Sequence, residues 1–232
     1  MHYDIHLTIT YTYESPVAGG RHVLRVMPLT LPGSQRLVVG SLSVDPGPAE
    51  RRDGTDFFGN STTAIAYRES HIDFEARMHA RVAVEPETDF LDMSCGLGEL
   101  GAELASILSL APDSPHHFLA PSPRIPADGN IAAYVRALAE PGLPARDIVH
   151  RLSSRIYEDF AYDKQATRVE TTPREAFSMK RGVCQDFAQV MIAGLRSLGI
   201  PAAYVSGYLR TIPPPGKARL AGADAMHAWV RA

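Results

Sequence analysis

The spacing of apolar residues changes part-way along the chain, and this change limits the folds that are available. From Tyr3 to Tyr11 apolar and polar residues alternate, a period of two that is typical of a strand with one buried face. Further β-rich runs separated by turn residues follow up to about residue 95, at 22–29, 36–44, 62–68 and 79–84. Short strands with regular turns between them predict an antiparallel β-sandwich here.

A helical pattern follows, and the boundary between two domains is expected nearby. Residues 98–110 carry leucines and an isoleucine at helical spacing. Five prolines then fall between residues 112 and 126, and proline is excluded from regular helix and central strand. We expect the inter-domain connection in this stretch. The predicted organisation is a β-sandwich domain over 1–110 and an α+β domain over 111–232.

Helix start signals recur in the second domain. Asp128 is a good N-cap residue before a helix over 131–139. Pro144 is placed to open the next helix, whose apolar residues lie four apart. Thr172, with a proline next and Glu175 three residues later, forms the pattern of a capping box. These signals predict three helices before the most informative segment.

Cys184 lies at the start of an apolar segment that predicts a buried helix over 183–198. Gly199 ends this pattern, and Pro201 prevents its continuation. The first turn of a helix has unpaired backbone N–H groups and the positive end of the dipole, which favour a thiolate over a thiol. We therefore interpret Cys184 as a candidate nucleophile.

His227 is the candidate partner of this thiol. Residues 203–209 and 226–230 predict two strands, joined by a Pro/Gly-rich loop over 211–225. We expect this loop to be exposed, mobile and involved in admitting substrate. A helix followed by an antiparallel pair can bring His227 against the Cys184 sulfur. The imidazole would then take the thiol proton and deliver one to a leaving amine.

Structural interpretations compete with this one. Buried cysteines are usually small core residues, and Cys95 has no neighbours that suggest another role. A metal site that uses Cys184, His227 and another histidine is a further hypothesis, but no short-spaced second ligand accompanies either residue. We therefore expect no metal and no cofactor.

Composition limits the partners and the cellular setting. The formal net charge is −3, which gives no broad attraction for nucleic acid. No apolar run approaches about 18 residues, so no spanning helix and no membrane partner are predicted. Two cysteines cannot form a disulfide framework, and free thiols favour a cytoplasmic setting. The oligomeric state is left open.

Four motifs resemble the bacterial transglutaminase-like family of the papain-like cysteine enzyme superfamily. They are Gly-Val-Cys-Gln-Asp-Phe-Ala at 182–188, Gly-Ile-Pro-Ala at 199–202, Tyr-Val-Ser-Gly-Tyr at 204–208 and His-Ala-Trp-Val at 227–230. The resemblance implies that Cys184 is the nucleophile and His227 the general base and acid. The substrate would be a peptide or protein amide. Related enzymes place an aromatic oxyanion donor upstream of the cysteine, for which Tyr162 is the candidate; a structural role in packing is the alternative.

The resemblance also implies an aspartate on the strand after His227, and the sequence ends with Val230, Arg231 and Ala232. Asp224 and Asp186 are poorly placed to serve instead. We therefore expect a fragment of a longer protein whose second domain is truncated at the C-terminus and whose turnover is impaired. A binding or scaffold module without turnover is the alternative.

Overall fold

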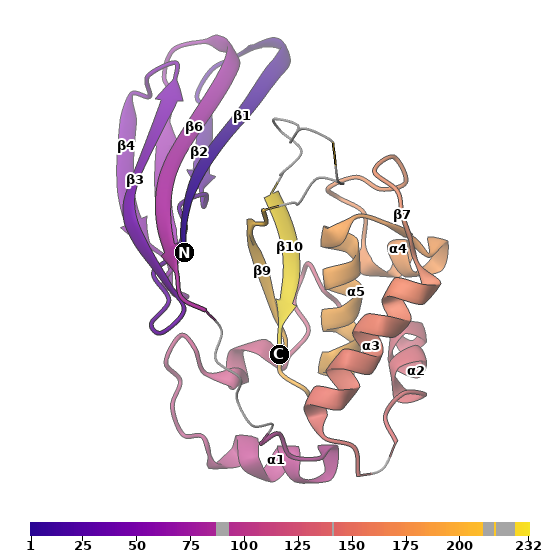
Figure 1. Cartoon of the computed structure of the whole chain (residues 1–232). Helices are drawn as coiled ribbons and strands as arrows, with labels where there is room; N and C mark the ends of the chain where they lie inside the picture. Colours follow the sequence, from indigo (N-terminus) through magenta and orange to yellow (C-terminus); the bar gives the residue numbers. More distant parts are fainter. Residues whose placement is uncertain (87–92, 141, 211–215, 217–225) are drawn as a thin grey trace. The chain divides into compact units, whose positions relative to one another are not determined.

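The computed structural model describes residues 1–86, 93–140, 142–210, 216 and 226–232. The chain forms two compact units, Met1–Phe90 and Leu91–Ala232. Figure 1 shows the elements of each unit.

The first unit is an antiparallel β-sandwich, as the alternating pattern predicted. One sheet has the strand order β1-β6-β3 and the other the order β2-β5-β4, with every described pairing antiparallel. The strands are β1 (His2–Val17), β2 (Arg21–Leu24), β3 (Gln35–Asp45), β4 (Glu50–Thr55), β5 (Ser61–Ala66) and β6 (His71–Val84). Strand β6 is central to its sheet, and its Phe74 and Met78 are among the most buried side chains of the chain.

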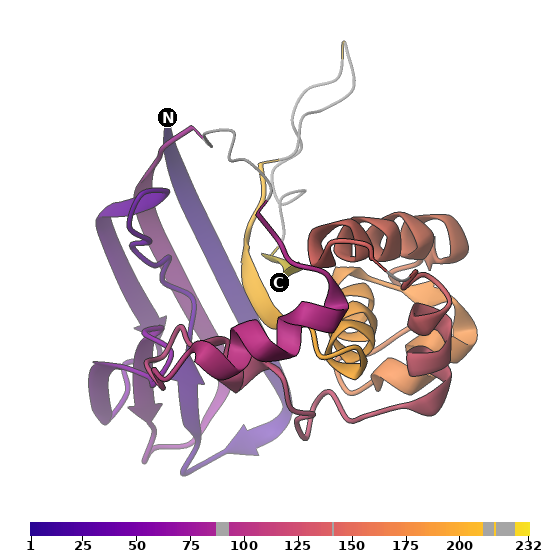
Figure 2. The same ribbon diagram turned by 90° about the horizontal axis from the view of Figure 1, so that it is seen from below.

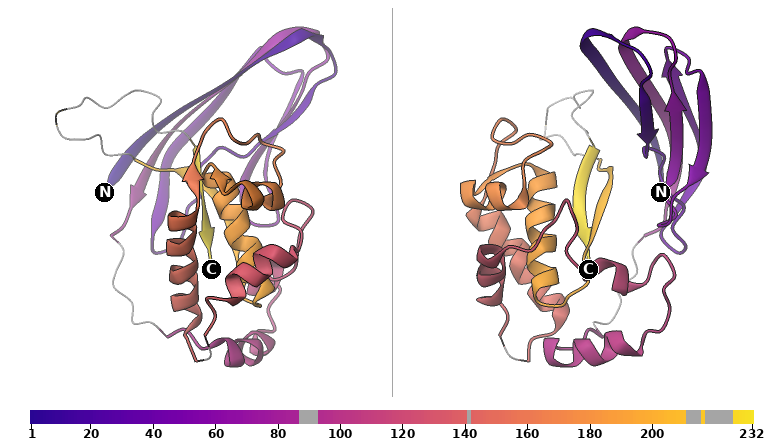
Figure 3. Two further views of the ribbon diagram at one scale, coloured as in Figure 1. Left: turned by 90° about the vertical axis from the view of Figure 1, so that its right-hand side faces the viewer. Right: turned by 180° about the vertical axis from the view of Figure 1, so that it is seen from behind.

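The second unit has an α+β architecture with one central helix. Its elements are α1 (Leu97–Ser106), the 3-10 helix η1 (Pro115–Phe118), α2 (Gly129–Arg136), α3 (Ala145–Asp159), β7 (Ala161–Tyr162), α4 (Pro173–Met179), β8 (Arg181–Gly182), α5 (Cys184–Ser197), β9 (Ala203–Tyr208) and β10 (Met226–Arg231). Helix α5 contacts α2, α3 and α4, and it also contacts the β9–β10 pair (Figure 3). Its residues Val190, Ile192 and Leu195 are fully buried.

The predicted boundary at residue 110 and the predicted inter-domain connection both differ from the division into units. Helix α1 belongs to the second unit, although the sequence places it before a boundary at residue 110. Its start is held there because Gly96 pairs with Pro144 and the Ala145 N–H donates to the Cys95 carbonyl. The five-proline stretch is irregular apart from η1, and Ile125 within it is part of the second unit's core. The stretch therefore lies inside this unit rather than between the two.

The predicted helix starts are confirmed at two positions. The Asp128 carboxylate accepts hydrogen bonds from the Asn130 and Ile131 N–H groups, and Thr172 with Glu175 forms a complete capping box. The predicted loop over 211–225 lies outside the described residues, except for Gly216. Among the helices of the described residues, none has the length and apolar character needed to cross a membrane.

Candidate active site

Cys184 is the first residue of α5 and is half-buried. The residue before it, Val183, has no side-chain acceptor and makes no side-chain cap. The first four N–H groups of a helix have no partner within the helix. The thiol therefore sits beside donors that suit a developing negative charge.

Asp186 fixes the start of this helix from inside. Its side chain is 1% exposed, and its Oδ2 atom accepts hydrogen bonds from the Val183 N–H at 2.8 Å and from the Thr167 hydroxyl at 2.6 Å. The Gln185 side chain also donates to the Val169 carbonyl at 3.3 Å. These bonds tie the segment around residues 167–169 to the first turn of α5.

Gly182 is required by this arrangement. A Cβ atom at this position would lie 2.5 Å from the Asp186 Oδ2 and 2.9 Å from the Asp186 Cβ, closer than side-chain atoms pack. Glycine therefore allows the carboxylate to lie against the backbone immediately before the cysteine.

His227 lies on β10, beside the helix that Cys184 opens (Figure 3). It is half-buried, and its Nε2 atom is buried with no hydrogen-bond partner among the described residues. In the antiparallel register His227 faces Gly207, and the Trp229 ring lies over that glycine, 2.6 Å from where a Cβ would be. The fold thus brings the elements of the two predicted residues side by side.

Tyr162 also lies close to the start of α5. Strand β7 pairs with β8, so that Tyr162 is opposite Gly182. Its ring packs edge-on against Phe187, with 6.3 Å between ring centroids, and its side chain is 55% exposed. The phenol is therefore exposed, on a strand that pairs with the segment immediately before α5.

Tyr204 is a further polar residue near this site that the sequence analysis did not assign. Burial raises the pKa of its phenol, and the negative charges of Cys184 and Asp186 raise it further, whereas Arg124 lowers it. The hydroxyl therefore stays protonated at neutral pH and can donate a hydrogen bond. Tyr204 was noted only as part of the motif at 204–208, and Thr167 carries no local sequence signal. The roles of both depend on the packing of β9 and of the segment after β7 against α5.

The second cysteine is in a different environment. Cys95 precedes α1, and a hydrogen bond with Glu103, together with partial burial, raises the pKa of its thiol. A raised thiol pKa lowers the thiolate fraction at neutral pH. The structural interpretation of Cys95 is consistent with this environment.

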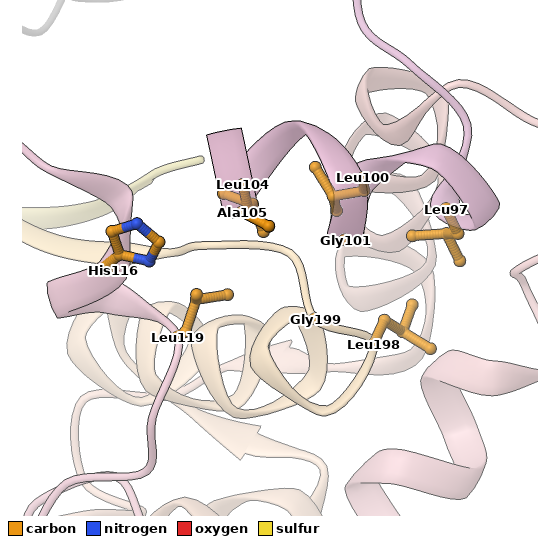
Figure 4. Close-up of a pocket in the computed structure, with 9 residues that line it drawn as sticks. All are labelled: Leu97, Leu100, Gly101, Leu104, Ala105, His116, Leu119, Leu198 and Gly199. Carbon is orange, nitrogen blue, oxygen red and sulfur yellow. The ribbon is translucent and has the colours of Figure 1, made fainter. Parts of the chain in front are cut away.

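A pocket of about 450 Å³ lies at the other end of α5 (Figure 4). It is lined by α1, by His116 and Leu119, and by Leu198 and Gly199 just after α5 (Figure 4). Figure 2 shows the ribbon of α1 in magenta. Fourteen residues of helical rise separate Cys184 from Leu198, about 20 Å. The pocket is therefore distinct from the candidate site.

The second unit, whose central helix begins at a cysteine beside a strand that carries a histidine, has a papain-like α+β fold. Residues 3–83 match the bacterial transglutaminase-like N-terminal region, and residues 131–232 match the transglutaminase-like superfamily. The chain belongs to the bacterial transglutaminase-like family.

Several relatives and a solved structure are also similar to this chain. An uncharacterized protein of Mycobacterium tuberculosis strain H37Rv is 38% identical over 200 residues, covering 84% of this chain and 62% of its own length. The chain thus spans 62% of the length of that relative. An uncharacterized protein of Mycobacterium leprae is 28% identical over 225 residues, covering 96% of this chain and 76% of its own length. A crystal structure of a "putative cysteine protease" from Cytophaga hutchinsonii shares the fold, with a TM-score of 0.70 and 21% identity over 99% of this chain and 74% of that one.

Proposed function

We propose that the protein is a cysteine-dependent acyl-transfer enzyme that acts on amide bonds of peptides or proteins. The observation that carries this proposal is the position of Cys184 at the first turn of α5, next to the strand that carries His227. Acyl transfer requires a nucleophile and a base on adjacent elements. Family membership supports the same reaction.

In the proposed reaction His227 takes the proton of the Cys184 thiol, and the sulfur attacks the amide carbonyl. The carbonyl oxygen becomes negatively charged, and the Cys184 N–H and the Tyr162 hydroxyl donate to it. When the C–N bond breaks, His227 gives its proton to the leaving nitrogen, which leaves as an amine or as ammonia. Water or a second amine then attacks the thioester and releases the thiol.

Two variants and one matched control test this proposal. Purified protein is assayed for amide hydrolysis and for incorporation of a labelled amine into a glutamine-containing peptide. Cys184→Ala and His227→Ala should each lower turnover by about 10³-fold or more, whereas Cys95→Ala should retain it. Turnover by Cys184→Ala equal to that of the unchanged chain would overturn the proposal.

Alkylation tests the nucleophile separately from turnover. Iodoacetamide labelling at neutral pH, followed by peptide mass spectrometry, should modify Cys184 faster than Cys95, whose raised pKa keeps it protonated. Equal rates at the two thiols would contradict an activated Cys184.

A binding or scaffold role without turnover is the alternative. It is favoured by the absence, among the described residues, of a hydrogen-bond partner for the buried Nε2 of His227. An experiment in cells separates the two roles. Under the scaffold alternative, a gene that encodes Cys184→Ala should restore the phenotype of a deletion strain as fully as the unchanged gene does. We further propose a reducing, cytoplasmic setting, which the two free thiols support.

A further inference from the structure

Two histidines face each other on the polar face of the β1–β6–β3 sheet. His6 on β1 is directly opposite His79 on β6 in the antiparallel register, and both side chains are exposed. Their rings meet edge-on with 4.5 Å between centroids. The two Nδ1 atoms converge to 2.6 Å. The strands therefore aim two ring nitrogens at one point.

A hydrogen bond between these nitrogens requires an uneven sharing of protons. One Nδ1 must carry a proton and the other must accept it, so the two neutral rings hold different tautomers. A cation placed between them would instead take the lone pairs of both Nδ1 atoms, with the remaining proton of each ring on Nε2. That change moves one proton from Nδ1 to Nε2 within one ring and leaves the net charge of the rings unchanged.

The 2.6 Å between the two Nδ1 atoms is close to the distance between two histidine nitrogens that bind one zinc ion. Zinc lies about 2.0–2.1 Å from a histidine nitrogen in tetrahedral geometry, which places two such nitrogens about 3.3 Å apart. Separating the two rings by less than about 1 Å meets this requirement. Both side chains are exposed, so small rotations supply that movement without repacking the core.

The charges around the pair are already neutralised. On the same face of β6 the pair is flanked by Arg81 and Arg77. Arg81 makes a two-pronged ion pair with Asp4 at 2.6 and 2.8 Å, and Arg77 is paired with Glu75. From β3, Ser41 lies opposite His79 in the register. A cation at the two Nδ1 atoms would thus meet paired arginines and a hydroxyl.

We propose that His6 and His79 form a two-histidine site for a divalent late transition-metal ion such as Zn²⁺. Imidazole suits zinc, nickel and copper, whereas magnesium and calcium prefer oxygen ligands. No cluster of three or more His, Cys, Asp or Glu ligands occurs in the part of the chain that the structure describes. The two imidazoles are therefore the protein's own ligands, and water completes the coordination.

Calorimetric titration of the full chain with ZnCl₂, after treatment with EDTA and its removal, tests this site. The unchanged chain should bind an equivalent of zinc that His6→Ala and His79→Ala each bind at least about 10-fold more weakly. The double variant should be no weaker than either single variant, because a chelate is lost with its first ligand. His2→Ala, on the same face and next to the amino terminus, is the matched control and should retain the equivalent.

The comparison between variants and a measurement of melting temperature make the result decisive. Zinc that binds at Cys184 or elsewhere contributes equally to all the proteins and cancels in the comparison. The melting temperature should rise with added zinc for the unchanged chain and His2→Ala but not for the two site variants, and MgCl₂ should produce no rise. Identical zinc stoichiometry and affinity in the unchanged chain and the double variant, or no zinc uptake by the unchanged chain, would overturn the proposal.

Discussion

Asp186 uses one of its two carboxylate oxygens to hold the start of α5. Both hydrogen bonds, from Val183 and Thr167, go to Oδ2. The other oxygen, Oδ1, is buried without a partner among the described residues, as is the Oε1 atom of Gln189 three residues later. Residues three apart lie on the same face of a helix. Two buried acceptors therefore lie on one helix face, and neither has a donor in the part of the chain that the structure describes.

This arrangement predicts that Asp186→Asn is tolerated. The amide oxygen can keep both hydrogen bonds at the position of Oδ2, and the amide N–H groups supply a donor next to Gln189. We expect the free energy of unfolding to change by less than about 1 kcal/mol, whereas Asp186→Ala should lose about 1–3 kcal/mol because the Val183 N–H is left unpaired. Urea unfolding measures both. A loss for the asparagine variant as large as for alanine would show that the charge itself is required.

Tyr162 gives a prediction about the reaction rather than about stability. If its hydroxyl donates to the oxyanion, Tyr162→Phe removes one donor that acts only in the transition state. We expect kcat to fall by about 10²-fold with KM little changed. Because the ring still packs on Phe187, the melting temperature should be retained. An unchanged kcat would assign Tyr162 to packing alone.

At the scale of elements, Asp128 joins two helices of the second unit. Its carboxylate caps α2 and also accepts a hydrogen bond from Arg174 on α4 at 2.6 Å, while its own side chain is 4% exposed. The hydrogen bond from the Ile131 N–H and the Arg174 guanidinium hold the pKa of this carboxyl below its usual range. A lowered pKa stabilises the fold above the unfolded value of about 3.9, and this stabilisation is lost as the pH falls through the folded value.

Asp128→Ala should therefore destabilise the protein by about 1–2 kcal/mol at neutral pH. The difference from the unchanged chain should shrink as the pH falls from about 4 through the lower pKa of the folded state, because the carboxyl is protonated first in the unfolded chain and then in the folded one. Chemical unfolding at pH 7 and at decreasing pH gives this difference directly. A difference that stays constant into acid would show that the charge of Asp128 contributes nothing.

Local signals explain which elements could be predicted from the sequence. The caps at Asp128 and Thr172 and the start of α5 at Cys184 are set by adjacent residues. Strand β4 was missed because all six of its residues are exposed, so no apolar alternation marks it. Strand β6 begins at His71, eight residues before the predicted run, because its buried positions include alanines, which carry little β signal.

In the candidate site, too, some residues could be predicted from local sequence signals and others could not. Cys184 and His227 were assigned from motifs that include their neighbours. Thr167 and Gly182 were not assigned, because their roles depend on a buried carboxylate that the fold brings against them. Asp186 was considered only as a partner for the histidine. Its bonds to Val183 and Thr167 place it instead in support of the helix start.

At the scale of the whole molecule, the helices and strands differ in how completely they bury their apolar side chains. On the inner face of β1, Ile5 and Leu7 are only half-buried. In α5, by contrast, Val190, Ile192 and Leu195 have no exposed area. Local opening costs more where more apolar surface is buried.

Hydrogen exchange followed by mass spectrometry should therefore find the slowest amides in α5. The amides of β1 and β4 should exchange earlier, β4 because it is an exposed edge strand. The expected order compares elements within one intact chain, so it needs no variant. Amides of β1 that outlast those of α5 would show that the sandwich is the more stable unit.

An enzyme that attaches amines to glutamine side chains must avoid using its own amines as acceptors. This chain has three lysines, Lys164, Lys180 and Lys217. The Lys180 ammonium is buried over the rings of Tyr134, Phe160 and Phe177, at 3.5–4.4 Å from their centroids. It is thus withheld from a thioester that forms four residues further along the chain. If the proposed reaction is transamidation, the lysine that precedes the nucleophile most closely in the chain is thus unavailable as an acceptor, whereas Lys164 is exposed and could serve as one.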